Sequence, residues 1–217
     1  MRKIIAATFV SLDGIMQAPG GPEEDPAGGF KFGGWTFHYW DDAMGAFMGE
    51  TFSKPYALLL GRKTYDIFAA HWPHQKDDPI AESFNAVTKY VATHRPDSLS
   101  WQNSQPLGSD VVATLRKLKT EDGPDLLLQG SSELIQTLLA HDLIDEISLL
   151  IFPLVLGKGK RLFGQGTIPG AFKLTRSQAS STGVIMATYE RSGEIKVGSF
   201  APEKLSDAEV ERRKNLT

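Results

Sequence analysis

The chain has 217 residues, of which 41% are hydrophobic and 23% are charged, and this composition suits one large folded domain or one domain with a tail. The net charge of −3 argues against a protein that binds duplex nucleic acid, since such proteins carry clustered positive charge. Cysteine is absent, which excludes disulfides, thiolate nucleophiles and cysteine-ligated zinc. The apolar stretch at residues 4–10 is too short to cross a bilayer and no signal-peptide cleavage site follows it, so we expect a cytoplasmic protein.

The first part of the chain predicts a buried strand, a long loop and a helix. Residues 3–10 are rich in Ile, Val, Phe and Thr and predict a strand that is buried on both faces. Residues 17–35 are dense in Gly, Pro and acidic residues, which indicates an irregular surface loop that could serve as a lid. Residues 40–52 place apolar side chains at helical spacing, and Asp41 and Asp42 suit the first turn of that helix.

Strands and helices then alternate along the chain. We expect further strands at residues 56–60, 89–93, 98–101, 126–129 and 147–155, the last interrupted by Pro153, and a closing hairpin from residues 172–178 and 184–189. We expect helices at residues 64–71, 78–87, 109–119 and 132–139. The alternation predicts a three-layer α/β/α fold with a mostly parallel central sheet and antiparallel C-terminal strands.

The chain divides into an expected domain at residues 1–192 and a polar tail at residues 193–217. Ser206 opens a capping-box pattern in the tail, which is typical of a charged terminal helix. A solvated or frayed end is the alternative that we favour, since chain termini are often poorly ordered.

Helix N-termini that follow buried strands expose unpaired N–H groups and suit phosphate. The chain offers a turn with two cations and a hydroxyl at residues 61–64, a turn with one glycine and two serines at residues 130–133, and a basic strand end at residues 93–95. In an open α/β sheet all three would lie at the carboxyl ends of the strands, where ligands bind. Each turn taken alone is equally consistent with an ordinary solvated strand-to-helix connection.

Five segments, taken in order, resemble a known family. They are Ser-Leu-Asp-Gly at residues 11–14, Leu-Gly-Arg-Lys-Thr-Tyr at 60–65, Gln-Gly-Ser-Ser-Glu-Leu at 129–134, Leu-Ile-Asp-Glu-Ile at 143–147 and the Pro-to-Phe segment at 153–163. Together they resemble the dihydrofolate-reductase-like superfamily. They are most similar to the RibD C-terminal domain, the reductase domain of riboflavin biosynthesis, and its stand-alone bacterial relatives.

The resemblance implies NADPH as cofactor. It implies that the first turn cradles phosphates, that residues 93–95 flank the 2′-phosphate, and that the later glycine turn receives the pyrophosphate. The implied cofactor-binding residues are Gly61, Arg62, Lys63, Thr64, Thr93, His94, Arg95, Gly130, Ser131, Ser132, Glu133 and Leu134. Many relatives carry two consecutive glycines at the later turn, whereas this chain has Gly130-Ser131.

The candidate catalytic and substrate-binding residues match the family less closely than the cofactor-binding residues do. Asp13 and Asp42 are the candidate catalytic carboxylates, although Asp13 equally suits a turn and Asp42 a helix first turn. Gln129 and Trp40 are the candidate substrate-binding residues, with core packing as the alternative for Trp40 and its aromatic neighbours. The basic residues at 158–161 suit either a substrate phosphate or a solvated turn.

The sequence therefore predicts an NADPH-dependent reductase of a small pterin- or pyrimidine-like heterocycle. A non-catalytic NADP-binding regulatory or resistance module on the same fold is the alternative. The resemblance implies a homodimer. We expect no metal, because His71 and His74 have no further ligands nearby in the sequence, and no nucleic-acid or membrane partner.

Overall fold

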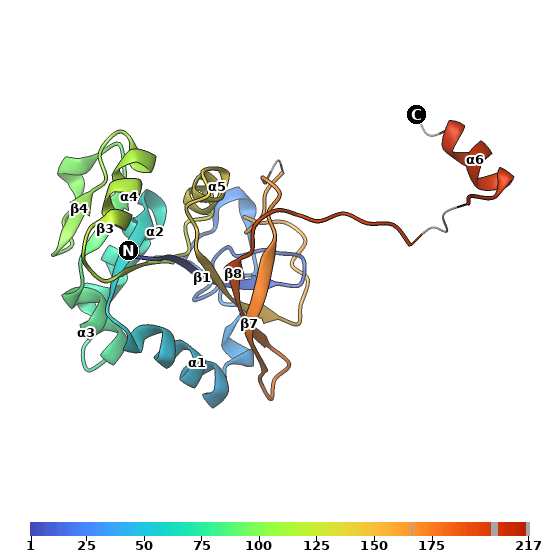
Figure 1. The fold of residues 1–217 in the computed structure, drawn as a ribbon. Coiled ribbons are helices and arrows are strands. Elements are labelled where there is room, and N and C mark those ends of the chain that lie inside the picture. The colour runs from blue at the N-terminus through green and yellow to red at the C-terminus, as the bar shows by residue number, and fades with distance from the viewer. Residues whose placement is uncertain (166, 201–203, 216–217) are drawn as a thin grey trace.

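A mixed sheet forms the centre of the protein, for which a computed structural model describes residues 1–165, 167–200 and 204–215. In this part of the chain the sheet has eight strands in the order β4-β3-β2-β5-β1-β6-β8-β7 (Figure 1). The strands are β1 (Ile4–Ser11), β2 (Tyr56–Gly61), β3 (Lys89–Ala92), β4 (Ser104–Pro106), β5 (Asp125–Gln129), β6 (Glu146–Phe152), β7 (Phe172–Ala179) and β8 (Ile185–Arg191). Strands β1 to β6 run parallel and β7 and β8 are antiparallel, which confirms the predicted sheet.

Helices cover both faces of the sheet. They are α1 (Asp42–Ser53), α2 (Arg62–His71), α3 (Pro79–Ala86), α4 (Val111–Thr120) and α5 (Ser132–Ala140), with α6 (Asp207–Lys214) in the tail. Asp41, Asp78 and Asp110 begin α1, α3 and α4 by accepting hydrogen bonds from first-turn N–H groups. Ser206 caps α6 in the same way, and Figure 1 shows this helix apart from the sheet.

The core lies on the two faces of the parallel strands. Leu126 and Leu128 pack with α4 and α5 on one face, whereas Leu58, Leu60 and Leu127 pack with α2 and α3 on the other. All five leucines are at most 1% exposed, and each contributes about 1.5–3 kcal/mol by burial. Their continuous apolar runs are what a strand covered on both faces requires.

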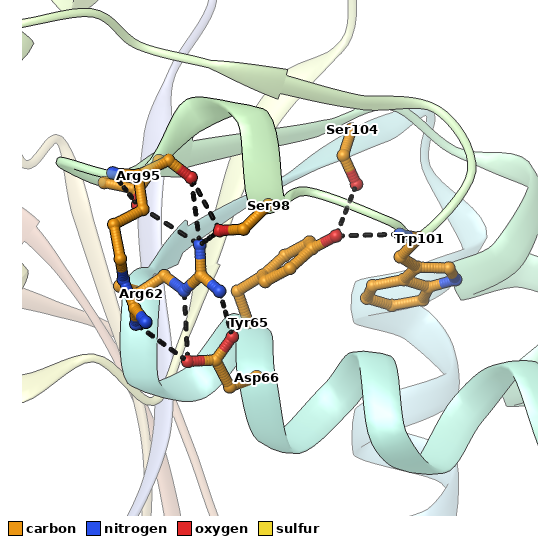
Figure 2. A network of polar contacts seen from close by, with 8 residues as sticks. Arg62, Tyr65, Asp66, Arg95, Ser98, Trp101 and Ser104 are labelled. Carbon is orange, nitrogen blue, oxygen red and sulfur yellow. Dashed lines mark hydrogen bonds and ion pairs between the residues drawn. The ribbon is translucent and has the colours of Figure 1, made fainter.

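The structure differs from the prediction at the strand expected at residues 98–101 and at the end of the strand expected at residues 147–155. The strand expected at residues 98–101 is absent from the described chain, because Pro96 opens a 3-10 turn there and the Trp101 N–H donates to the Tyr65 hydroxyl at 2.8 Å instead of to a sheet (Figure 2). β4 forms a few residues later, at Ser104–Pro106. β6 ends before Pro153, which has no N–H to continue the ladder.

The loop at residues 17–35 packs against the body of the protein. The buried Gln17 side chain donates to the carbonyls of Asp25 and Ala27, both at 2.9 Å. Trp35 donates from its indole to the Gln17 carbonyl at 2.8 Å. Phe30 and Trp35 are each 9% exposed and join the core cluster around α1. These hydrogen bonds hold the loop to itself and the burial of Phe30 and Trp35 holds it to the body, whereas composition alone indicated an irregular surface segment.

Candidate functional site

The turns that follow β2 and β5 touch each other. The Gly61 N–H donates to the Ser131 Oγ at 2.8 Å, and the Ser131 N–H and Oγ donate to the Thr64 Oγ1 at 3.0 and 2.9 Å. Gly130 permits this approach, because a Cβ at its position would lie 3.1 Å from the Thr64 Oγ1. Its φ of +57° also favours glycine. Two turns that are far apart in the sequence therefore form one unit at the carboxyl edge of the sheet.

This unit leaves two helix N-termini without side-chain caps. Neither Gly61 before α2 nor Ser131 before α5 caps its own helix, whereas aspartates cap α1, α3 and α4. The Ser131 hydroxyl is used between the turns instead, and its backbone adopts φ 59° and ψ 53°. That left-handed conformation costs about 1–2 kcal/mol for a residue with a Cβ. Adjacent first-turn N–H groups with a partial positive charge form a site that suits an anion.

Arg62 joins the first turn to the strand end at residues 93–95, as Figure 2 shows. Its guanidinium contacts Asp66 through two nitrogens, at 2.8 and 3.0 Å, and donates to the Ser98 Oγ at 2.6 Å and to the Arg95 carbonyl at 3.2 Å. The Arg62 side chain is 21% exposed, whereas that of Arg95 is 67% exposed. Arg62 thus positions the loop, whereas Arg95 is largely exposed and lies 3.7 Å from the carboxylate of Asp66.

The other predicted cofactor-binding residues differ in which of their groups a ligand can reach. Thr93 accepts the Arg95 N–H at 3.0 Å and so shapes the strand end, where His94 is exposed. The Leu134 side chain lies in the core, which leaves only its backbone for a ligand. Glu133 is exposed in the first turn of α5.

Asp13 fastens the end of β1 to the segment that follows β6. Its Oδ1 accepts the Ser11 Oγ at 2.6 Å and the Leu156 N–H at 3.1 Å, and its Oδ2 accepts the Gly157 N–H at 2.9 Å. Arg161 donates to its backbone carbonyl and lies 3.7 Å from its carboxylate. Burial alone would raise the pKa of Asp13, but the hydrogen bonds to Ser11, Leu156 and Gly157 bring it below its ordinary value. Both carboxylate oxygens are therefore already engaged.

Asp25, which the sequence did not single out, lies between two lysines. Its Oδ1 is 2.6 Å from the Lys63 Nζ and its Oδ2 is 2.7 Å from the Lys160 Nζ, while its own side chain is 8% exposed. Burial would raise its pKa, but hydrogen bonds from Lys160 and Lys63 lower it below the ordinary value. The sequence signal was only an acidic run in a loop. The partner on the distant segment at residues 157–161 was not predictable from it.

Gln129 and Trp40 belong to the face of the sheet that carries α1 and α2. Gln129 pairs with Ala7 at the end of β5, and its buried side-chain nitrogen is without a hydrogen-bond partner in the described part of the chain. Trp40 is 47% exposed and meets Phe9 edge-to-face at 6.2 Å. Trp35, by contrast, packs on Phe152 in the core. The aromatic cluster therefore divides into core rings and two exposed rings, Trp40 and Phe37, which a flat ligand can reach.

The two aspartates at the start of α1 have different environments. Asp41 is the N-cap, and its second oxygen accepts the Ser181 N–H and Oγ at 2.9 and 2.7 Å, which fastens α1 to the β7–β8 turn. Asp42 is exposed in the first helical turn. Asp42 is thus the one of this pair that is open to a ligand.

A second polar cluster surrounds Lys89, beside α3. Lys89 is fully buried, and its Nζ donates to the carbonyls of Asn85 and Gln102 and lies 4.3 Å from the Trp101 ring centre. Burial lowers its pKa to about 8. A hollow of about 410 Å³ adjoins this cluster, lined in part by His74. Protein carbonyls already satisfy the lysine, so we assign this cluster a structural role.

The described residues contain no group of three His, Asp or Glu residues that could hold a metal ion. No helix among them is long and apolar enough to cross a membrane.

Solved structures with the same arrangement of strands and helices define the class of fold. A pyrimidine reductase-like protein from Corynebacterium diphtheriae superposes with a TM-score of 0.57 at 11% identity, over 89% of this chain and 93% of that one. Dihydrofolate reductase from Enterococcus faecalis, solved with NADP(H), gives a TM-score of 0.53 at 14% identity, over 87% of this chain and 96% of that one. The fold is therefore dihydrofolate-reductase-like, as predicted.

The sequence comparisons identify the family. The model of the RibD C-terminal domain matches residues 2–186, so the chain belongs to that family. The uncharacterised protein YyaP of Bacillus subtilis is 27% identical over 197 residues, which cover 88% of this chain and 96% of YyaP. The family resemblance inferred from the five segments is confirmed.

Proposed function

We propose that the protein is an NADPH-dependent reductase of a small pterin- or pyrimidine-like heterocycle. The observation that carries this proposal is the pair of uncapped helix N-termini, α2 and α5, which the Thr64–Ser131 hydrogen bonds join at the carboxyl edge of the sheet. Such an edge is where open α/β folds bind nucleotides, and paired helix N-termini suit a pyrophosphate.

The residues of this edge fit a dinucleotide phosphate. The backbone N–H groups at residues 62–64 and 132–134 would receive the pyrophosphate, and Gly130 leaves the room that a Cβ would fill. The exposed Arg95 would meet the 2′-phosphate, with His94 beside it. Arg62 would act by holding the loop that carries them. Guanidinium groups bind phosphate with charge-assisted hydrogen bonds, which supports a preference for NADPH over NADH.

The substrate would lie on the face that carries Gln129 and Trp40. A buried side-chain nitrogen without a partner is unfavourable by about 1–3 kcal/mol, and a carbonyl or ring nitrogen of a heterocycle would satisfy it. The exposed ring of Trp40 offers a surface for stacking. NADPH would supply the hydride, so the protein must place the acceptor and manage one proton. We assign the proton to Asp42, the exposed carboxylate, and a turn-fastening role to Asp13.

A non-catalytic NADP-binding module is the second candidate function. It is favoured by one observation, the full engagement of the Asp13 carboxylate by Ser11, Leu156 and Gly157. Both candidates require the same cofactor site and differ only in turnover. The homodimer that the resemblance implies is part of either proposal and is checked by light scattering.

A fluorescence titration with NADPH and NADH tests the proposal. We expect saturable NADPH binding at sub-millimolar concentration and weaker NADH binding. NADPH oxidation in the presence of folates, pterins or pyrimidines would then distinguish the reductase from the non-catalytic module. Absence of NADPH binding at sub-millimolar concentration would overturn both.

A further inference from the structure

Asp25 holds together three parts of the site. It lies in the loop at residues 17–35, Lys63 lies in the first turn of α2, and Lys160 follows β6. The carboxylate contacts both ammonium groups, at 2.6 and 2.7 Å, and its Oδ1 also accepts the Ala27 N–H at 3.2 Å. It therefore occupies the space in which a ligand anion would bridge the two lysines.

The position of this carboxylate is fixed by the loop. The Gln17 side chain donates to the Asp25 carbonyl and accepts the Lys160 N–H at 3.0 Å, so it ties the backbones on both sides of the ion pair. Trp35 in turn donates to the Gln17 carbonyl. Because Gln17 is 4% and Trp35 9% exposed, the bonds that hold Asp25 in place are themselves buried.

The neighbouring cation of the same segment is also engaged. Arg161 donates to the carbonyls of Asp13 and Gly157 and lies 3.7 Å from the Asp13 carboxylate. The segment that follows β6 thus presents Lys160 and Arg161 to carboxylates of this chain. Only Lys158 of its three basic residues is without an ion pair among the described residues.

We propose that Asp25 is an internal counter-ion that excludes phosphate from the corner between Lys63 and Lys160, so that the site accepts a heterocycle without a phosphate group. A phosphate that bridged the two lysines would lie next to the Asp25 carboxylate. Both groups are negatively charged, and two like charges in contact repel strongly when they are partly buried. This inference rests on the proposed reductase function, in which the cofactor phosphates bind to the backbone N–H groups of α2 and α5 and not to these ammonium groups.

Isothermal titration with inorganic phosphate tests the inference, using wild type, Asp25→Asn and the double variant Asp25→Asn/Lys160→Met. The amide introduced by Asp25→Asn keeps an oxygen for the Ala27 N–H but removes the charge. We expect phosphate affinity to rise about 10-fold or more in Asp25→Asn and to return to the wild-type value in the double variant. An unchanged affinity in Asp25→Asn, or a gain that persists in the double variant, would overturn the proposal.

Three further measurements separate the possible outcomes. Near-ultraviolet circular dichroism, to which the buried Trp35 contributes with the other aromatic residues, reports whether tertiary packing is kept in each variant. Wild-type crystals soaked in sulfate need no variant: we expect Asp25 to remain between the lysines, and a sulfate in its place would contradict the proposal. NADPH titrations on the same proteins separate the two claims. Absent NADPH binding removes the reductase proposal, whereas normal NADPH binding without a phosphate gain in Asp25→Asn removes only this one.

Discussion

Two corners of the site lie at the carboxyl ends of the strands and differ in their electrostatics. One is formed by the turns after β2 and β5, and the other by the end of β1 and the segment after β6. At the turns of β2 and β5, the helices α2 and α5 begin without side-chain caps, and the largely exposed Arg95 lies 3.7 Å from the Asp66 carboxylate. At the corner where β1 meets the segment after β6, the cations are paired with Asp13 and Asp25. In our proposals the first corner binds an anion and the second excludes one. The difference lies in the helix starts and not in the basic residues, because Arg62, Lys63 and Arg95 of the first corner also have carboxylate partners.

The largest expected effect is a loss of NADPH affinity when Gly130, in the turn after β5, is replaced. Gly130→Ala places a Cβ 3.1 Å from the Thr64 Oγ1 at a φ of +57°, so the backbone is strained and the Thr64 side chain that joins the two turns must shift. We expect NADPH affinity to fall about 100-fold, which corresponds to about 2.7 kcal/mol. Gly108→Ala is the matched control, because its φ is +76° and a Cβ there meets nothing within 4 Å. Similar NADPH affinities for both variants would show that the contact between the turns is not part of the cofactor site.

Breaking the second corner should affect stability and not cofactor binding. Asp13→Ala removes the acceptor for Ser11, Leu156 and Gly157, and we expect the free energy of unfolding to fall by about 2 kcal/mol. NADPH affinity should change less than about twofold. Chemical denaturation and NADPH titration measure the two effects. A variant of wild-type stability that has lost turnover would instead assign Asp13 to the chemistry.

The lowered pKa of Asp13 adds a pH dependence to the same corner. Because the pKa lies below its value in the unfolded chain, the stabilisation is present above the ordinary carboxylate pKa and is lost as the pH falls through the folded value. We expect wild type to lose stability on acidification below about pH 4 more steeply than Asp13→Asn. Identical acid-unfolding curves would contradict the assignment.

Arg95 of the first corner should discriminate between the two nucleotides. Arg95→Ala is expected to weaken NADPH binding about 10-fold, by about 1.4 kcal/mol, while NADH binding changes little. Arg116→Ala on α4 is the control for the change in net charge, since Arg116 is exposed on another element. Equal losses for NADPH and NADH in Arg95→Ala would mean that Arg95 does not contact the 2′-phosphate.

The smallest expected effect is a gain in stability when Gln129, the last residue of β5, is replaced. Gln129→Leu removes a buried nitrogen without a partner among the described residues, so we expect the free energy of unfolding to rise by about 1 kcal/mol. The same change should raise the KM for a heterocyclic substrate while the NADPH affinity is retained. Thermal denaturation and steady-state kinetics give the two values. A loss of stability would show that the amide has a protein partner in solution.

The fold was largely predictable from the sequence because its signals are local. Continuous runs such as Leu58 to Leu60 indicate strands that are covered on both faces, and Asp78-Pro79 and Asp110 mark helix starts. The strand expected at residues 98–101 was wrong because a distant group, the Tyr65 hydroxyl, takes the Trp101 N–H. No local pattern contains that bond.

The site was predictable only in part, for the same reason. The turns at residues 61–64 and 130–133 carry their own glycines and hydroxyls, so the sequence pointed to them. The pairing of Asp25 with Lys160 spans 135 residues and depends on tertiary structure. Sequence reasoning therefore left the basic segment at residues 158–161 open between a phosphate site and a solvated turn, and missed the acid that pairs with it.

A crystal structure of the protein with NADPH tests the central claim most directly. We predict the pyrophosphate within hydrogen-bond distance of the first-turn N–H groups of α2 and α5, the 2′-phosphate beside Arg95, and Asp25 still between Lys63 and Lys160. A cofactor bound away from the joined turns, or a phosphate that has displaced Asp25 from the two lysines, would contradict the account.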